Sequence, residues 1–288
     1  MENIFVHLPL IKHMNKLPSI QRKKIRIGDI SISYLVSASA QPKYTVVFIH
    51  GFPFNKNMWI PQLESLPQDV QGIALDVRGH GRSTIGHGFF SVDVFARDLI
   101  GFIEKIGLRQ IVLCGVSMGG YIALRTFELA PALLKGLVLV STHVQADTDA
   151  AKIKRFDTIQ SVLKHGRRTF AIGFVKNVFS DYSLNTKPDE VAFIRSSIRR
   201  NDVRSICATL LALAARTDTT ASLKKIDFPV LVIKGTEDRL VSTEQIEQLK
   251  TYIPRVEFAQ LDLCGHLPNL EDTKQFNYLI DQYLTTLS

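Results

Sequence analysis

Ser117 lies in the segment Gly115-Val116-Ser117-Met118-Gly119-Gly120, directly after the apolar run 111–114 and directly before a helical pattern. A strand that turns sharply into a helix strains its turn residue, and only glycine tolerates the close contacts on either side. Such a G-x-S-x-G turn exposes the serine Oγ, and the helix N-terminus behind it favours developing negative charge. The pattern predicts a nucleophilic serine, with a glycine-rich turn and a passenger serine as the alternative.

A nucleophilic serine needs a base, and the base needs an acid that orients it. After this kind of turn the expected chain order is serine, acid, histidine. Asp238 follows the apolar run 230–233 and a glycine turn, and His266 follows the last strand pattern, 256–261. Sites in open α/β sheets form at the carboxyl ends of the strands. We therefore predict Ser117, Asp238 and His266 as a catalytic triad.

Other acids and histidines compete for two of these roles. Glu237 is adjacent to Asp238, and since adjacent residues on a turn point apart, only one of them can orient the imidazole. Asp262 lies near His266 in sequence. The alternative bases are His87 and His143.

A second loop can supply the hydrogen-bond donors that acyl transfer requires. His50-Gly51-Phe52-Pro53 ends the strand pattern 45–49. The oxyanion that develops in acyl transfer needs N–H groups aimed at it. We expect them from the backbone of Phe52 and of Met118, the residue after the nucleophile, with His50 holding the loop. The glycine-rich segment 76–83 is expected to shape the wall of the site.

Short apolar runs alternate with helical patterns over most of the chain. Strands are predicted at 25–36 (with a turn at Gly28-Asp29), 45–49, 72–75, 111–114, 137–140, 230–233 and 256–261. Helices are predicted at 92–106, 119–130, 246–252 and 273–284. This alternation predicts an α/β fold with a mostly parallel central sheet flanked by helices. Between 142 and 224 it stops, and a polar stretch rich in Arg and Lys predicts a helical insertion after the strand near 137–141.

The positive charge of the chain is unevenly distributed. The 288 residues include 35 Lys and Arg against 27 Asp and Glu, a net charge of +8. Residues 1–24, interpreted as a basic N-terminal arm, carry +4, residues 143–224 carry +6, and the remainder carries −2. No nucleic-acid-binding motif accompanies this charge, so nucleic acid is not a predicted partner. The first explanation of this charge is an ordinary solvated surface. The alternative hypothesis is that Arg195, Arg199, Arg200 and Arg204 steer an anionic substrate or an acidic carrier protein.

Cysteine usage and hydropathy bear on the location of the protein. Three scattered cysteines, Cys114, Cys207 and Cys264, have neither a disulfide framework nor metal-ligand spacing, which favours a reducing compartment. No apolar run has the length of a signal peptide or of a membrane span. We therefore predict a cytoplasmic protein without a membrane-spanning segment.

The motifs, in this order, resemble those of the α/β-hydrolase superfamily in its lidded serine-esterase branch, over roughly residues 25–287. The chain is most similar to enol-lactone hydrolases and to pimeloyl-carrier methyl ester esterases. The resemblance implies a hydrolase core of residues 25–142 and 225–288 and a helical cap of residues 143–224. It also implies that Phe54 and Trp59 are walls of an acyl pocket.

The residue order and the resemblance together predict an enzyme that cleaves a small carboxylic ester or lactone through an acyl-enzyme. The substrate could be anionic or carrier-bound, and the mechanism requires no metal or organic cofactor. Ser117 argues against dehalogenases and epoxide hydrolases, which carry Asp at this position. Three alternatives stay open: a cofactor-free perhydrolase, which shares the Ser-Met-Gly-Gly sequence, a menaquinone-pathway-type lyase, and a non-catalytic small-molecule receptor of the same fold.

Overall fold

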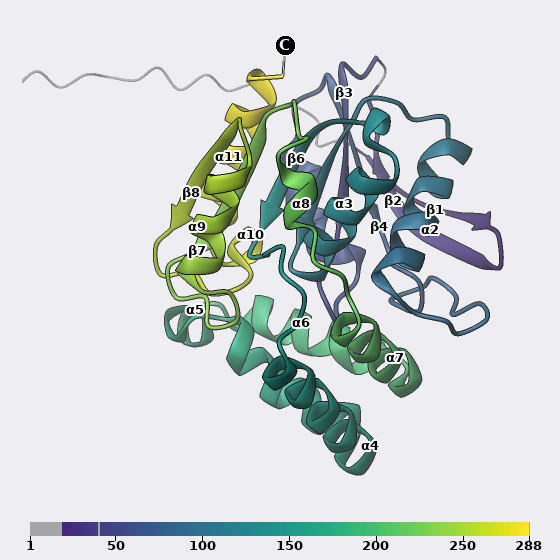
Figure 1. Ribbon diagram of the computed structural model, residues 1–288, viewed down its shortest axis with the longest axis vertical. Helices are drawn as coiled ribbons and strands as arrows, with labels where there is room; N and C mark the ends of the chain where they lie inside the picture. The colour runs from purple at the N-terminus through teal and green to yellow at the C-terminus, as the bar shows by residue number, and fades with distance from the viewer. Residues whose placement is uncertain (1–18, 40, 288) are drawn as a thin grey trace, which may run out of the picture.

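A computed structural model describes residues 19–39 and 41–287, and its centre is an eight-stranded sheet in the order β1-β2-β4-β3-β5-β6-β7-β8 (Figure 1). The strands are β1 (Ile20–Ile27), β2 (Ile30–Ser37), β3 (Tyr44–Ile49), β4 (Val70–Leu75), β5 (Ile111–Val116), β6 (Leu134–Val140), β7 (Val230–Gly235) and β8 (Val256–Leu261). β2 is antiparallel to both of its neighbours, and the other adjacent pairs are parallel. The predicted α/β fold with a mostly parallel sheet is confirmed.

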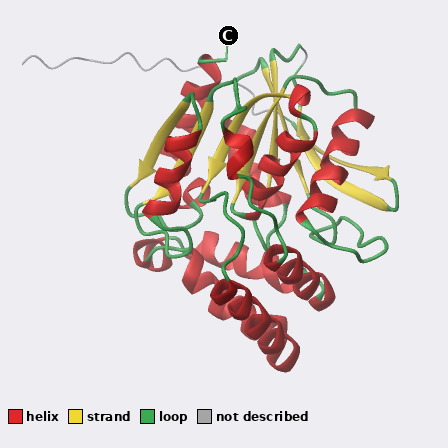
Figure 2. Cartoon of the chain, viewed as in Figure 1, coloured by secondary structure: helices red, strands yellow, loops and turns green. Residues whose placement is uncertain are grey.

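Helices cover both faces of the sheet (Figure 2). One core contains α2 (Val92–Lys105), α3 (Met118–Leu129) and α9 (Thr243–Tyr252); the other contains α1 (Ile60–Ser65) and α11 (Thr273–Thr285). Successive side chains of a strand point to opposite faces. In β3, accordingly, Val47 and Ile49 join the first core and Val46 and Phe48 join the second. Burial on both faces explains why the central strands appear in the sequence as continuous apolar runs.

Four helices between β6 and β7 form a separate group at the carboxyl end of the sheet (Figure 1). They are α4 (Asp149–Val178), α5 (Asp181–Thr186), α6 (Pro188–Arg200) and α7 (Val203–Ala214), and we call them the insertion helices. α4 contacts both α6 and α7. Gly166, with φ 77° and ψ 165°, divides α4 into two helical segments.

Short helices complete the chain. They are η1 (Lys56–Trp59), η2 (Pro131–Leu133), α8 (Thr220–Leu223) and α10 (Pro268–Glu271). In the described residues, no helix is long and apolar enough to cross a membrane.

The predicted boundary of the basic N-terminal arm, 1–24, is wrong. Residues 1–18 lie outside the described residues, but β1 begins at Ile20 and pairs antiparallel with β2, from Ile20 opposite Ser37 to Lys24 opposite Ser33. The four residues 21–24, Gln-Arg-Lys-Lys, are exposed on this edge strand. Charged side chains are common on sheet edges because they hinder pairing with other chains, and they hide the alternation by which a strand is predicted.

Candidate active site

Ser117 occupies a strained turn between β5 and α3, with φ 52° and ψ −115°. The turn is fixed by two hydrogen bonds: Ser117 N–H donates to the carbonyl of Val140 at 2.8 Å, and the Thr142 hydroxyl donates to the carbonyl of Ser117 at 2.9 Å. A Cβ on Gly119 would lie 2.2 Å from the carbonyl oxygen of Ile49. Glycine is therefore required for α3 to begin so close to β3, and the surrounding structure holds the serine in a conformation that costs free energy.

The side chains of Asp238 and His266 meet at the carboxyl ends of β7 and β8. Both carboxylate oxygens lie 3.0 Å from Nδ1 of His266, and the two side chains are 0% and 3% exposed. Burial raises the pKa of Asp238, but the charge and hydrogen bond of His266 and the N–H groups of Leu240 and Val241 outweigh it and hold the pKa below its ordinary value. The carboxylate therefore accepts the Nδ1–H, which leaves Nε2 as the ring atom that can exchange a proton in the cavity.

The rival acids and bases lie elsewhere. In the described part of the chain, Asp238 is the carboxylate within hydrogen-bond distance of His266. The backbone N–H of Glu237 donates to the carbonyl of Cys264 at 2.8 Å, and the hydrogen bonds and ion pair of the His266 ring go to Asp238 and not to the Glu237 carboxylate. The imidazole of His87 is 78% exposed and lies beside Asp29.

One cavity of about 960 Å³ is lined by Ser117, His266 and Phe52 together, with residues of the insertion helices on its other side. His143 also lines it, but burial lowers the pKa of this histidine to about 4, and it contacts Arg216 instead of a carboxylate. The volume is typical of a small-molecule site.

The loop after β3 places Phe52 in the same cavity as the turn at Ser117. His50 holds this loop: its Nδ1 lies 2.9 Å from the carbonyl of Gly51, and its Nε2 accepts the N–H of Val77 at 3.0 Å. Burial lowers the pKa of His50 to about 4, so the ring is neutral and Nδ1 is the donor. The backbone N–H groups of Phe52 and Met118 donate to no other described residue, which leaves both available as donors.

Phe54 and Trp59 do not line the cavity, and the expectation that they form its walls is wrong. Both are fully buried. The Trp59 ring packs against Phe48 and Phe276, with centroids 5.0 and 6.1 Å apart. The reason is that the chain turns at residues 54–59 into η1, which directs these side chains into the core on the α11 side of the sheet.

The aromatic walls come instead from the insertion helices. Phe170 and Phe174 of α4 line the cavity, and their ring centroids lie 6.3 and 6.0 Å from that of Phe52. Their spacing of four residues places them on one face of the helix. Nothing in the sequence marks this pair as different from ordinary core aromatics.

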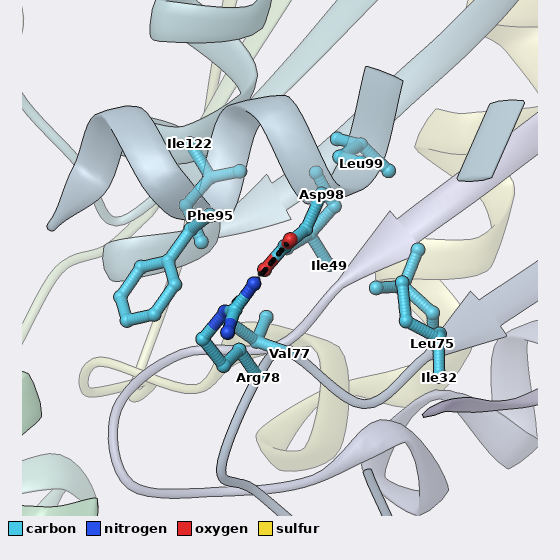
Figure 3. A pocket seen from close by; sticks show the side chains of 9 residues that line it. All are labelled: Ile32, Ile49, Leu75, Val77, Arg78, Phe95, Asp98, Leu99 and Ile122. Carbon is cyan, nitrogen blue, oxygen red and sulfur yellow. Dashed lines mark hydrogen bonds and ion pairs between the residues drawn. The ribbon is translucent and has the colours of Figure 1, made fainter. Parts of the chain in front are cut away.

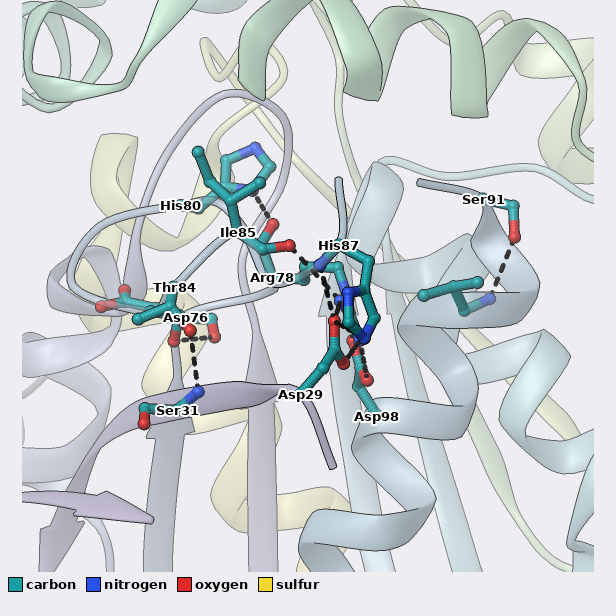
Figure 4. Close-up of polar contacts among 12 residues, drawn as sticks. Asp29, Ser31, Asp76, Arg78, His80, Thr84, Ile85, His87, Ser91 and Asp98 are labelled. Atoms are coloured by element: carbon teal, nitrogen blue, oxygen red, sulfur yellow. Dashed lines mark hydrogen bonds and ion pairs between the residues drawn. The ribbon is translucent and has the colours of Figure 1, made fainter. Parts of the chain in front are cut away.

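The loop after β4, residues 76–83, is held by one buried ion pair and by two half-buried ones. The Lys56 ammonium lies 2.5 Å from the Asp76 carboxylate. Arg78 donates to Asp29 and to Asp98, two bonds to each (Figure 4). Figure 3 shows the small pocket beside Arg78 and Asp98, which shares no lining residue with the cavity at Ser117. These contacts hold the loop in place, but none of residues 76–83 lines the cavity at Ser117, so the expectation that this segment shapes the wall of the site is not confirmed.

The comparisons with known proteins agree with this architecture. A sequence model of the alpha/beta hydrolase fold matches residues 44–273. The chain belongs to the α/β-hydrolase family. Over 211 residues it is 32% identical to a non-heme chloroperoxidase of Streptomyces lividans, covering 68% of this chain and 75% of the relative. It is 23% identical over 253 residues to 3-oxoadipate enol-lactonase 2 of Acinetobacter baylyi, covering 88% and 92% of the two chains.

Among solved structures, an esterase has a similar fold. The fold matches that of a thermophilic esterase from Thermogutta terrifontis with a TM-score of 0.86 and 29% identity, covering 93% of this chain and 99% of the other. The relatives of this α/β hydrolase thus include hydrolases and esterases, which supports a hydrolase.

Asn201 joins the insertion of this α/β hydrolase to the loops after β3 and β4. Its side-chain amide donates to the carbonyl of Pro53 at 2.5 Å, and its Oδ1 accepts the N–H of Gly81 at 3.2 Å. Its partners lie 148 and 120 positions away in the chain. Sequence reasoning missed this residue because no local pattern marks it.

Glu271 was also missed, and it supports the loop that carries His266. Its buried carboxylate accepts three backbone N–H groups: those of Ser180 and Gly265 at 2.9 Å and that of Leu267 at 3.0 Å. One carboxylate therefore ties the residues on both sides of the histidine to the segment between α4 and α5. Within the described ranges, 19–39 and 41–287, no group of three or more His, Cys, Asp or Glu side chains is arranged to hold a metal ion.

Proposed function

We propose that this α/β hydrolase cleaves a small carboxylic ester or lactone through an acyl-enzyme on Ser117, with His266 as base and Asp238 as the acid that orients it. One observation carries the proposal. The ring of His266 is held by both oxygens of a buried, ionised Asp238, and it shares a cavity with the serine of the strained turn. This combination supplies a nucleophile, an oriented base and room for a small molecule.

In the first half of the reaction, Ser117 Oγ attacks the carbonyl carbon while its proton passes to Nε2 of His266. The carbonyl electron pair moves onto the oxygen, where the N–H groups of Phe52 and Met118 stabilise the negative charge. When this electron pair re-forms the carbonyl double bond, the bond between the carbonyl carbon and the leaving oxygen breaks, and that oxygen takes the proton from Nε2. With a lactone, the new alcohol stays attached to the acyl group.

In the second half, water attacks the acyl-enzyme. His266 takes a proton from the water, a new bond forms between the water oxygen and the carbonyl carbon, and the bond to Ser117 Oγ breaks. The proton on Nε2 passes to Oγ, which restores the serine. Asp238 remains ionised throughout and stabilises the imidazolium that forms twice in the cycle.

The same proposal assigns residues 143–224 the role of a cap. Its support is the position of the insertion helices at the carboxyl end of the sheet and the two rings of α4 that face Phe52. The cap would exclude water from the acyl group while the leaving group departs.

Replacement of the nucleophile tests the proposal. We expect Ser117→Ala to abolish hydrolysis of short p-nitrophenyl esters and covalent labelling by a fluorophosphonate, while the circular dichroism spectrum stays that of the wild type. Ser196→Ala, the same change at a residue of α6 that does not line the cavity, is the matched control and should keep both signals. Undiminished ester turnover in Ser117→Ala would refute the assignment.

A second candidate reaction transfers the acyl group from Ser117 to hydrogen peroxide instead of water. The relative with 32% identity is a non-heme chloroperoxidase, and the nucleophile turn carries Ser-Met-Gly-Gly. In this alternative, hydrogen peroxide replaces water in the second half and the products are a peracid and free Ser117. Peracid formation from acetate and hydrogen peroxide, absent in Ser117→Ala, would support it, and its absence in the wild type would exclude it.

A further inference from the structure

Charged side chains line one part of the cavity. Lys154 and Arg155 come from the first turns of α4, and Asp147 comes from the loop just before it. Of the acidic residues in the described part of the chain, Asp147 alone is among the lining residues. Whether this part of the cavity attracts cations or anions therefore depends on how the charge of Asp147 is balanced.

Asp147 is already paired with two guanidinium groups. Its carboxylate accepts hydrogen bonds from Arg155 and from Arg216, and the side chains of Asp147 and Arg216 are only 4% and 2% exposed. Burial raises the pKa of Asp147, but the hydrogen bonds and charges of the two arginines outweigh it and hold the pKa below its ordinary value. The three groups together carry one positive charge in excess.

Arg216 cannot leave this arrangement to serve a ligand. Its Nη2 donates to the carbonyl of Gln145 at 2.7 Å, its Nη1 donates to the carbonyl of Leu213 at 3.2 Å, and its guanidinium carbon lies 4.3 Å from the centroid of the Tyr121 ring. Arg216 does not line the cavity. It holds and neutralises Asp147 from behind, so the excess charge is presented to the cavity by Arg155 and Lys154.

Both of these cations have donors left over. Arg155 binds Asp147 through Nε and Nη2, and Nη1 has no partner in the described part of the chain. The Lys154 ammonium forms no ion pair with a described acid. Lys154 directly precedes Arg155 in α4, and both residues line the cavity. Lys154 is exposed and Arg155 is half-buried.

We infer that Lys154 and Arg155 form an anion-binding subsite in the cavity, and that this hydrolase selects esters or lactones bearing a second, carboxylate group. This inference rests on the proposed function and extends it to the class of substrate. The scissile carbonyl lies at Ser117, and the distant carboxylate receives the unpaired guanidinium N–H and the ammonium group. A planar guanidinium suits a carboxylate in particular.

The exposed arginines of α6 and α7 have a different position. Arg195, Arg199, Arg200 and Arg204 are exposed and do not line the cavity. They can act only at long range, where salt screens them. The proposed subsite therefore differs from long-range electrostatic attraction because its two cations line the cavity.

Two esters of equal acyl length test the inference: mono-p-nitrophenyl glutarate, which carries a terminal carboxylate, and p-nitrophenyl pentanoate, which is neutral. The readout is the ratio of their kcat/KM values. In Lys154→Gln we expect the ratio to fall about tenfold, as for loss of one charge-assisted hydrogen bond. Arg199→Gln removes the same charge from outside the cavity and should leave the ratio within about twofold of wild type.

An unchanged ratio in Lys154→Gln, or an equal fall in Arg199→Gln, overturns the inference while hydrolysis of the pentanoate still supports the proposed function. If neither ester is cleaved, the proposed function fails, and calorimetry with glutarate and pentanoate on the wild-type protein decides the subsite alone. Tighter binding of glutarate that weakens about tenfold in Lys154→Gln supports it. Equal binding of the two acids, or no binding of glutarate, overturns it.

Discussion

The orientation of one imidazole depends on a single carboxylate. Asp238 places both oxygens 3.0 Å from Nδ1 of His266, and the N–H groups of Leu240 and Val241 donate to one of those oxygens at 2.8 and 3.2 Å. These two bonds hold the Asp238 carboxylate in the position from which it contacts His266. The tautomer with hydrogen on Nδ1 follows, because an ionised carboxylate can only accept.

Asp238→Asn should lower kcat for a neutral p-nitrophenyl ester by roughly 10³- to 10⁴-fold, because an amide can donate to Nδ1 and so favour the wrong tautomer. The fold should survive, since the amide has the same shape. Glu237→Gln, one residue earlier, is the control and should retain wild-type kcat. Equal losses in the two variants would show that the acid has been misassigned.

Among the individual residues of the site, those that lie in a local sequence motif could be predicted, and those whose partners are distant in the sequence could not. Ser117 is flanked by glycines, and Asp238 and His266 each follow a strand and a glycine turn. Glu271 and Asn201 bind partners 91 and 148 positions away, so no spacing in the sequence indicates them. Phe54 and Trp59 were wrongly placed because an aromatic residue near a site has the same sequence pattern as one in the core.

The elements differ in how clearly the sequence specifies them. The central strands are buried on both faces and appear as apolar runs, and α2, which has Ser91 as N-cap, was predicted within one residue at its C-terminal end. β1 lies at the edge and is mostly exposed, so its first five residues were assigned to the arm. η1 and α1 are four and six residues long, too short for a helical period to show.

Two glycines within helices provide a matched test of how closely the elements pack. Gly119→Ala should lower the free energy of unfolding by about 3 kcal/mol, since the new Cβ would lie 2.2 Å from the carbonyl oxygen of Ile49. Gly173→Ala, in α4, has no neighbour within 4 Å of the new Cβ and should raise stability by about 1 kcal/mol through helix propensity. Urea denaturation measures both; a Gly119→Ala variant as stable as Gly173→Ala would contradict the close contact of α3 with β3.

For the whole molecule, the loops at the carboxyl end of the sheet contain three buried, neutral histidines. Burial lowers the pKa of His50 and of His143 to about 4 and that of His80 to about 3, from an ordinary value of 6.5. His50 and His80 lie together, with ring centroids 5.1 Å apart. The unfolded chain can protonate all three where the folded chain cannot.

Stability should therefore fall as the pH drops from 6.5 towards 4, because in this range the unfolded state binds more protons. Each histidine contributes up to about 1.4 kcal/mol per pH unit. Urea denaturation at pH 7.5 and pH 5 measures the loss. His50→Gln should reduce the loss, whereas His165→Gln, on an exposed position of α4, should not. The same loss in His50→Gln as in wild type would mean that His50 is not neutral when folded.

The carboxylate of Glu271 has a consequence for recombining this enzyme with its relatives. It binds Ser180 N–H as well as the loop of His266, and the N–H of His266 itself donates to the carbonyl of Val178 at 2.8 Å. The end of α4 is therefore part of the support for His266. A chimera that imports the insertion helices of a relative should keep residues 178–180 from the same parent as residues 265–271, so the functional crossover lies inside the insertion and not at its ends.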